Sequence, residues 1–123
     1  IYFRSKPELC FYIYNKDQGK DIVYEPRPYF KYQCEDKEYY YKPDFLLENK
    51  LYEIKGDYFF DKAGNLINPY NRSLDNIAKA KQLCMEEHDV TILKSDKYMF
   101  YVDYVKEKYG TDYIETFRYK KED

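Results

Sequence analysis

Two strand-like segments separated by only two residues constrain the fold of this 123-residue chain most strongly. Residues 38–47 and 50–55 are rich in aromatic and aliphatic side chains, and Glu48 and Asn49 lie between them. A two-residue connection between such segments predicts a tight β-hairpin. Because side chains alternate between the two faces of a strand, closing the hairpin at these two residues fixes every cross-strand pair.

The rest of the chain predicts an α/β (α+β) fold. Pro26 and Pro28 restrict the first strand to a sheet edge or to an irregular start. Three strands in a meander, followed by a fourth reached through a helix, predict a mixed central sheet flanked by helices. We expect one domain over 1–123, with a core over about 5–93 and a C-terminal helical appendix over about 95–118. The expected elements are helix 5–15, strands 22–33, 38–47 and 50–55, helix 74–87, strand 90–93, and helices 95–110 and 113–117.

The rare residue types exclude several classes of site. Cys10, Cys34 and Cys84 form no C-x-x-C pair, which argues against a zinc ribbon or a disulfide framework and favours a reducing, cytoplasmic compartment. The single histidine, His88, excludes H-E-x-x-H and two-histidine nuclease sites, and the four glycines form no phosphate-binding loop. No apolar run approaches the roughly 18 residues of a membrane helix, so we expect no membrane partner.

Tyrosine is unusually frequent, with 18 residues in a chain of net charge −2. Tyrosine rings can stack on nucleic-acid bases. Codon bias also explains them, because lysine outnumbers arginine 17 to 4 and residues with AT-rich codons dominate the composition. That composition indicates an AT-rich bacterium, or a phage that infects one, as the source.

The predicted hairpin places two carboxylates opposite each other. If Leu47 faces Lys50, then Asp44 faces Glu53 with their Cβ atoms about 5 Å apart. Two carboxylates this close repel each other unless a positive charge lies between them, and oxygen ligands of this kind suit Mg²⁺. Lys55 lies one strand step from Glu53 and adds a second positive charge. The alternative interpretation is an ordinary strand face of paired surface charges.

Pro43-Asp44 followed by Glu53-Ile54-Lys55 resembles the signature of the PD-(D/E)XK nuclease superfamily. The order αβββαβ over 5–93, about three quarters of the chain, is similar to its restriction-endonuclease-like core. Residues 5–14 and 52–56 also resemble small nuclease-like proteins of phages and their hosts.

The resemblance implies a metal-dependent endonuclease that hydrolyses phosphodiester bonds, with DNA as the expected substrate. Asp44, Glu53 and the main-chain carbonyl of Ile54 would hold Mg²⁺, for which Mn²⁺ can substitute. Lys55 would orient the attacking water, or help to deprotonate it, and would stabilise the phosphate.

Further candidates each have a second interpretation. Glu8 either joins the catalytic residues or only completes a capping box with Ser5. Lys81 and Gln82 either reach the site or lie on a solvated helix face. The segment 57–73 either covers the substrate or is a disordered insertion. The candidate phosphate contacts, each of which is also consistent with an ordinary surface charge, are Lys42, Lys62 and Arg72, together with Arg4 and Lys6.

Two other classes of function remain open from the sequence. One is a catalytically silent nuclease-fold module that binds nucleic acid or a protein partner. The other is a structural phage protein whose charged hairpin has no chemical role. For a nuclease, cutting both strands of a duplex with one site per chain requires either a homodimer or two successive nicks.

Overall fold

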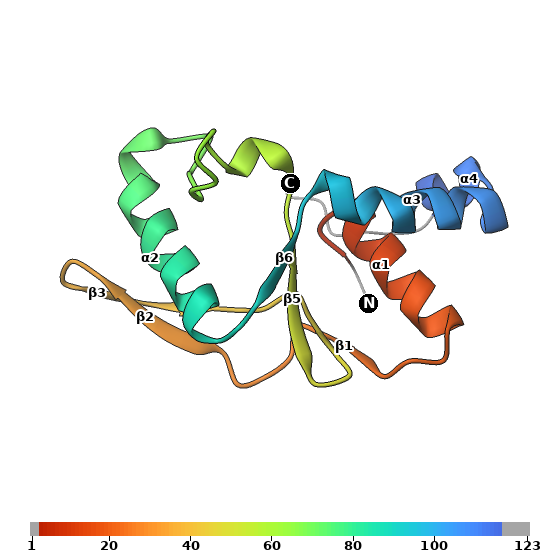
Figure 1. Cartoon of the computed structure of the whole chain (residues 1–123), viewed down its shortest axis with the longest axis horizontal. Coiled ribbons are helices and arrows are strands. Elements are labelled where there is room, and N and C mark those ends of the chain that lie inside the picture. Colours follow the sequence, from red (N-terminus) through yellow and green to blue (C-terminus); the bar gives the residue numbers. More distant parts are fainter. Residues whose placement is uncertain (1–2, 117–123) are drawn as a thin grey trace.

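The chain folds around a central sheet with helices on both sides (Figure 1). The computed structural model describes residues 3–116. Its elements are the α-helices α1 (Lys6–Asp17), α2 (Asp75–Glu87), α3 (Ser95–Tyr109) and α4 (Thr111–Thr116), the 3-10 helices η1 (Asp57–Phe59) and η2 (Arg72–Leu74), and the strands β1 (Ile22–Tyr24), β2 (Phe30–Cys34), β3 (Lys37–Tyr41), β4 (Phe45–Leu47), β5 (Lys50–Ile54) and β6 (Thr91–Leu93).

The central sheet has the strand order β1-β4-β5-β6. The strands β1, β4 and β5 are antiparallel neighbours, and β6 runs parallel to β5. A parallel neighbour needs a crossover connection, and α2 lies in that connection. The predicted α+β fold, with three meander strands and a fourth reached through a helix, is therefore confirmed.

The predictions of continuous strands over 22–33 and 38–47 are wrong, because each segment is broken into two strands. Pro26 and Pro28 lie between β1 and β2, and Pro43 lies between β3 and β4. Proline has no backbone N–H and cannot donate a hydrogen bond within a sheet. The strands β2 and β3 instead pair with each other, as a separate hairpin inserted between two neighbours of the central sheet.

The first helix begins at the cap that the sequence predicted. Ser5 is extended, and the backbone N–H of Glu8 donates a hydrogen bond of 3.3 Å to its Oγ. Farther along α1, the ring of Phe11 lies 5.1 Å from that of Phe45 on β4 and 4.9 Å from that of Tyr101 on α3. Aromatic packing of this kind fixes α1 between the sheet and α3.

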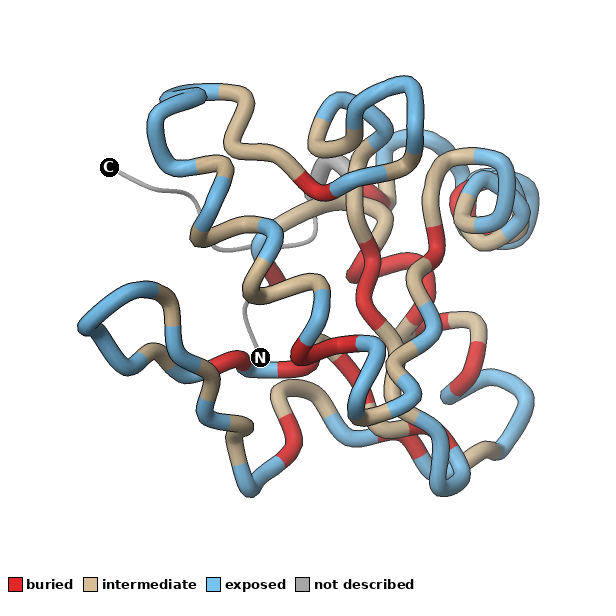
Figure 2. Tube along the Cα trace, turned by 60° about the vertical axis from the view of Figure 1, so that its left-hand side comes forward, coloured by how far each residue is buried: buried red, intermediate tan, exposed pale blue. Residues whose placement is uncertain are grey.

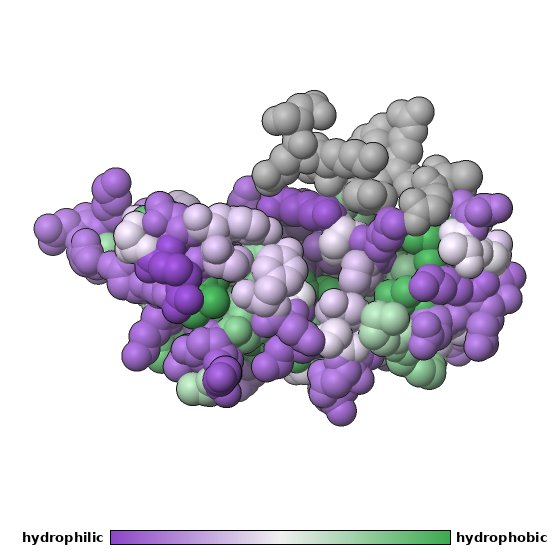
Figure 3. Space-filling model, turned by 90° about the horizontal axis from the view of Figure 1, so that it is seen from above, coloured by the Kyte–Doolittle hydropathy of each residue, from purple (hydrophilic) through white to green (hydrophobic). Residues whose placement is uncertain are grey.

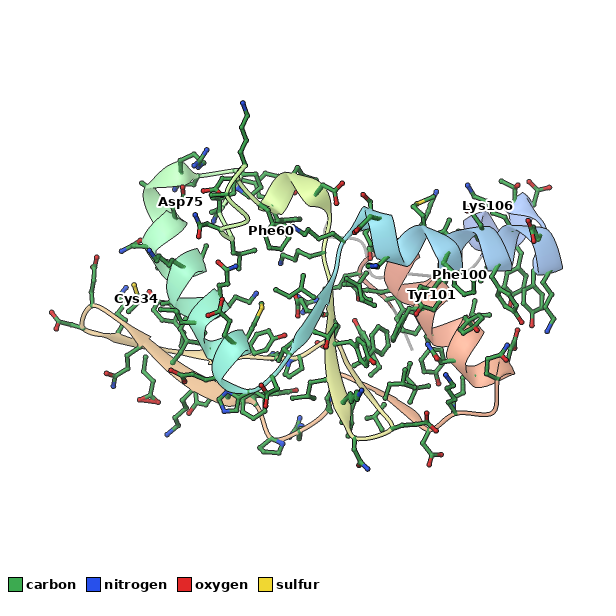
Figure 4. All side chains as sticks on the ribbon, viewed as in Figure 1. Cys34, Phe60, Asp75, Phe100, Tyr101 and Lys106 are labelled. Atoms are coloured by element: carbon green, nitrogen blue, oxygen red, sulfur yellow. The ribbon has the colours of Figure 1, made fainter. Side chains whose placement is uncertain are left out.

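Two hydrophobic cores lie on opposite sides of the sheet, and buried residues follow its strands (Figure 2). One core joins α1, α3 and the sheet, and Tyr101 extends from α3 toward α1 (Figure 4). The other core joins α2 to the inserted hairpin and includes Tyr41, Leu66 and Met85. Many of the tyrosines pack around these cores, so part of the tyrosine content serves the fold.

The expected C-terminal helices are present as α3 and α4. Val102 and Val105 are buried, as predicted, and Gly110 ends α3 with a φ of +90°, a conformation that glycine adopts without strain. Phe117 and the charged tail 118–123 lie outside the described residues. Within 3–116, no helix has both the length and the apolar composition that crossing a bilayer requires.

Candidate active site

The β4–β5 hairpin has the register on which the predicted site depends. Leu47 pairs with Lys50, and both turn residues between them have positive φ values, 46° and 71°. Positive φ at both central positions is the geometry of a type I′ turn. The paired residues end at Phe45 with Tyr52, and one further step in this register places Asp44 opposite Glu53.

Asp44 lies just before β4 and is fixed through hydrogen bonds to the backbone. Its Oδ2 accepts a hydrogen bond of 2.8 Å from the N–H of Ile54, and its carbonyl accepts one of 2.8 Å from the N–H of Glu25. Burial raises the pKa of the Asp44 carboxyl well above its ordinary value, and repulsion from Glu53 and Glu8 adds to this effect. Burial and repulsion between the carboxylates therefore outweigh the stabilisation that the Ile54 hydrogen bond gives to the Asp44 carboxylate.

Glu53 is buried, with 4% of its surface exposed. The hydroxyl of Tyr41 donates a hydrogen bond of 2.7 Å to its Oε1, and Lys55 Nζ lies 3.8 Å from its Oε2. Tyr41 comes from β3, so the inserted hairpin helps to orient this carboxylate. Tyr41 was not predicted as a site residue, because no local motif distinguishes it from the other tyrosines.

Glu8 belongs to the helix cap and to the carboxylate group at once. Ser5 Oγ donates a hydrogen bond of 3.3 Å to Glu8 Oε1, and the hydroxyl of Tyr24 donates one of 3.4 Å to Oε2. Burial raises the pKa of the Glu8 carboxyl to about 7, with a further contribution from repulsion by Glu53. Tyr24 on β1 is a second residue that sequence reasoning missed.

Two lysines approach the carboxylates from different elements. Lys55 follows β5, and its Nζ lies 4.4 Å from the centroid of the Phe59 ring. Lys81 comes from α2, with its Nζ 5.6 Å from the ring centroid of Tyr41. Burial lowers the pKa of Lys81, repulsion from Lys55 lowers it further, and attraction to Glu53 opposes the decrease. The structure thus places Lys81 in the same electrostatic environment as the predicted catalytic residues.

The segment 57–73 is ordered, and Gln82 fixes it to α2. Gln82 Oε1 accepts a hydrogen bond of 2.8 Å from the N–H of Leu66, and its Nε2 donates one of 3.0 Å to the carbonyl of Gly64. Asp75 accepts a hydrogen bond of 2.8 Å from the N–H of Asn68. The alternative of a disordered insertion is therefore wrong, and both ends of the Gln82 amide bond to this segment.

The other predicted phosphate contacts are dispersed. Arg72 pairs with Asp75 at 2.7 Å, at the start of α2, and Lys62 is exposed within 57–73. Lys42 is exposed, with its Nζ 5.1 Å from the ring centroid of Tyr29. Arg4 lies 3.9 Å from Glu25, from Nη2 to Oε2, and its charge lowers the pKa of Glu8. Lys6, at the start of α1, is partly buried.

The donor set fits a hard cation that keeps part of its hydration shell. Within 3–116, no three His, Cys, Asp or Glu side chains are grouped so that they could hold a metal ion. Asp44 and Glu53 nevertheless offer carboxylate oxygens, and the main-chain carbonyl of Ile54 belongs to the same strand end. Mg²⁺ commonly binds through one or two carboxylates and retains several waters. Positive charge here would also offset the repulsion that raises the pKa of Asp44.

Comparison with protein-family models, with curated proteins and with solved structures found no match. The resemblance to the PD-(D/E)XK nucleases therefore depends on the site residues and on the order of the elements.

Proposed function

We propose that this protein is a divalent-metal-dependent nuclease that hydrolyses phosphodiester bonds, with DNA as its substrate. The observation that carries the proposal is the meeting of Asp44, Glu53 and Lys55 at one end of the β4–β5 hairpin. Glu8 from α1 and Lys81 from α2 share their electrostatic environment. Two opposed carboxylates beside lysines supply the charges that this reaction needs.

The reaction builds negative charge on the phosphoryl oxygens as water attacks. A bound Mg²⁺ or Mn²⁺ ion would lower the pKa of that water and offset the developing charge. Asp44, Glu53 and the carbonyl of Ile54 would hold the ion. The hydrogen bond from the N–H of Ile54 fixes Asp44, and the hydroxyl of Tyr41 fixes Glu53.

Lys55 would act directly on the phosphate. Its side chain is largely buried, and Nζ is held between Glu53 and the Phe59 ring. An ammonium group here can donate to a phosphoryl oxygen or orient the attacking water. Because the group is already positioned, little reorganisation is needed when charge develops.

Plasmid cleavage tests the proposal. Wild-type protein should cleave supercoiled plasmid or single-stranded DNA with Mg²⁺ or Mn²⁺ but not with EDTA. We expect Asp44→Ala and Lys55→Ala each to reduce the rate at least about 100-fold. Lys50→Ala is the matched control and should retain wild-type activity, because Lys50 is exposed and lies at the turn end of β5, away from Glu53. Cleavage in EDTA, or an unchanged rate in Asp44→Ala, would contradict the proposal.

A catalytically silent nucleic-acid-binding module is the second candidate. The observation that favours it is the lack of a group of three metal-ligating side chains among the residues described. Such a module would bind labelled DNA, yet it would not cleave single-stranded or plasmid DNA with either metal. Metal-dependent turnover would exclude it.

A further inference from the structure

Two tyrosines on the segment 57–73 point into solvent. Tyr58 is 59% exposed and Tyr70 is 78% exposed, although many of the other tyrosines pack around the cores. Their hydroxyls lie 3.3 Å apart, and their ring centroids are 6.4 Å apart at an interplanar angle of 71°. We call these two residues the tyrosine pair. Exposed rings of this kind leave apolar area in water that packing within the chain does not use.

Neighbouring residues hold the tyrosine pair in place. The ring of Phe59 lies 4.4 Å from that of Tyr58 and 6.0 Å from that of Tyr70. A Cβ at Gly56 would lie 2.8 Å from the Tyr58 ring, so glycine permits the close approach. Asn68 Oδ1 accepts a hydrogen bond of 3.0 Å from the N–H of Tyr70. The rings are therefore ordered before any ligand binds, which reduces the entropy cost of binding.

The tyrosine pair lies next to the candidate active site. The Phe59 ring contacts Tyr58, and Lys55 Nζ also lies 4.4 Å from the Phe59 centroid. Lys94 Nζ lies 4.5 Å from the ring centroid of Phe60, which lies near the top of the sheet, close to the start of α3 (Figure 4). Asp57, the acidic neighbour, is hydrogen-bonded to the N–H and hydroxyl of Ser95.

Rings and ammonium groups thus lie close together beside the site. Seen from above, this end of the molecule is mainly hydrophilic, with small hydrophobic patches between the polar side chains (Figure 3). Aromatic rings combined with lysines form the pattern that binds single-stranded nucleic acid, because rings stack on bases while cations contact phosphates. A duplex hides its base faces by internal stacking, so it cannot use the rings in this way.

We propose that the tyrosine pair stacks on unpaired bases, so that the substrate class is single-stranded nucleic acid or a single-stranded region beside the scissile phosphate. As a statement about substrate, this inference rests on the proposed nuclease function. The binding it describes requires neither metal nor cleavage, and it can be measured separately.

The test measures binding in EDTA at fixed low salt, by fluorescence anisotropy of a short labelled strand. Single-stranded DNA, single-stranded RNA of the same sequence and the DNA duplex are compared. We expect wild-type protein to bind at least one single strand more tightly than the duplex. The double variant Tyr58→Leu/Tyr70→Leu should bind that strand at least about tenfold more weakly. Comparison of the DNA and RNA arms identifies the preferred strand.

Two variants make the test specific. Tyr40→Leu is the matched control, because Tyr40 is 56% exposed but lies on the inserted hairpin, and it should bind like wild type. Tyr58→Phe/Tyr70→Phe keeps the rings without the hydroxyls and should also retain binding. A strand carrying 2-aminopurine should lose fluorescence on binding to wild type through stacking, and the leucine double variant should abolish that loss.

The inference is overturned if the leucine double variant binds single strands like wild type, if Tyr40→Leu weakens binding equally, or if the duplex binds as tightly as every single strand. These outcomes are separate from failure of the nuclease proposal. Binding that depends on the tyrosine pair, with no cleavage in Mn²⁺, would support base stacking by the pair and contradict the nuclease proposal. Plasmid cleavage without binding to single strands would support the nuclease proposal and contradict base stacking by the pair.

Discussion

Single residues of the candidate site illustrate how its carboxylates are stabilised. Asp44 accepts a hydrogen bond from a backbone N–H, Glu53 accepts one from Tyr41, and Glu8 accepts from Ser5 and Tyr24. Hydrogen bonds to ionised carboxylates are stronger than those between neutral groups. Even so, burial and mutual repulsion raise the pKa values of Asp44 and Glu8.

Tyr41→Phe removes the hydroxyl that donates to Glu53 and leaves the ring in its core. Because the acceptor is a buried carboxylate, we expect the free energy of unfolding to fall by about 1.5–3 kcal/mol at pH 8. Urea denaturation measures this change. Tyr39→Phe, on the same strand but partly exposed, should change it by less than about 0.5 kcal/mol. Equal effects of the two substitutions would contradict an orienting role for Tyr41.

The pKa of Glu8 predicts how stability depends on pH. The folded protein keeps a proton on Glu8 up to about pH 7, whereas the unfolded chain releases it near the ordinary value of 4.5. Between these values the folded state binds more protons, so the free energy of unfolding falls as pH rises. The fall attributable to Glu8 is at most about 3 kcal/mol between pH 4.5 and 8.

Thermal or urea unfolding of metal-free protein across this pH range measures the effect. Glu8→Gln should flatten the decline, and the remaining slope should come partly from Asp44, whose pKa is raised in the same direction. An identical pH profile for wild type and Glu8→Gln would contradict the assignment.

Elements bring the site residues together from distant parts of the sequence. The β4–β5 hairpin supplies Asp44 and Glu53, α1 supplies Glu8 and α2 supplies Lys81. The inserted hairpin adds Tyr41, and the segment 57–73 extends directly from the end of β5. Gln82 connects that segment to α2, so the helix that carries Lys81 also fixes the loop beside Lys55.

Gln82→Ala removes the two hydrogen bonds that the Gln82 amide makes to the segment 57–73. The N–H of Leu66 and the carbonyl of Gly64 lose their partner, so we expect a loss of about 1–3 kcal/mol in the free energy of unfolding. Amide hydrogen exchange at Leu66 should become faster. Lys79→Ala, an exposed position on the same helix, is the control and should leave this exchange rate unchanged. Unaltered protection of the Leu66 amide in Gln82→Ala would show that Gln82 does not hold the segment 57–73 against α2.

In the molecule as a whole, local sequence patterns predicted some features of the fold and the candidate site and missed others. The helix cap at Ser5, the turn at Glu48 and the register of Asp44 with Glu53 follow from short-range rules, and the sequence predicted them. The separation of the β2–β3 hairpin from the central sheet was missed, because 22–33 and 38–47 were predicted as continuous strands although prolines interrupt both segments. The hydrogen bond from Tyr41 to Glu53 was missed because it joins two hairpins.

The distribution of charge over the molecule is consistent with a metal site at one end of the sheet. The chain carries a net charge of −2, yet buried carboxylates and two lysines gather at one end of the sheet. A bound divalent cation would invert the local charge and favour an anionic substrate. Metal-free protein should therefore be stabilised by Mn²⁺ as well as activated by it.

Direct titration with Mn²⁺, followed by the electron paramagnetic resonance signal of the free ion, tests the proposed metal site without knowledge of the substrate. We expect saturable binding to wild type, strong weakening in Asp44→Ala and near-normal binding in Lys50→Ala, which lies at the far end of the hairpin. No binding to the folded wild-type protein, or equal binding to Asp44→Ala, would contradict it.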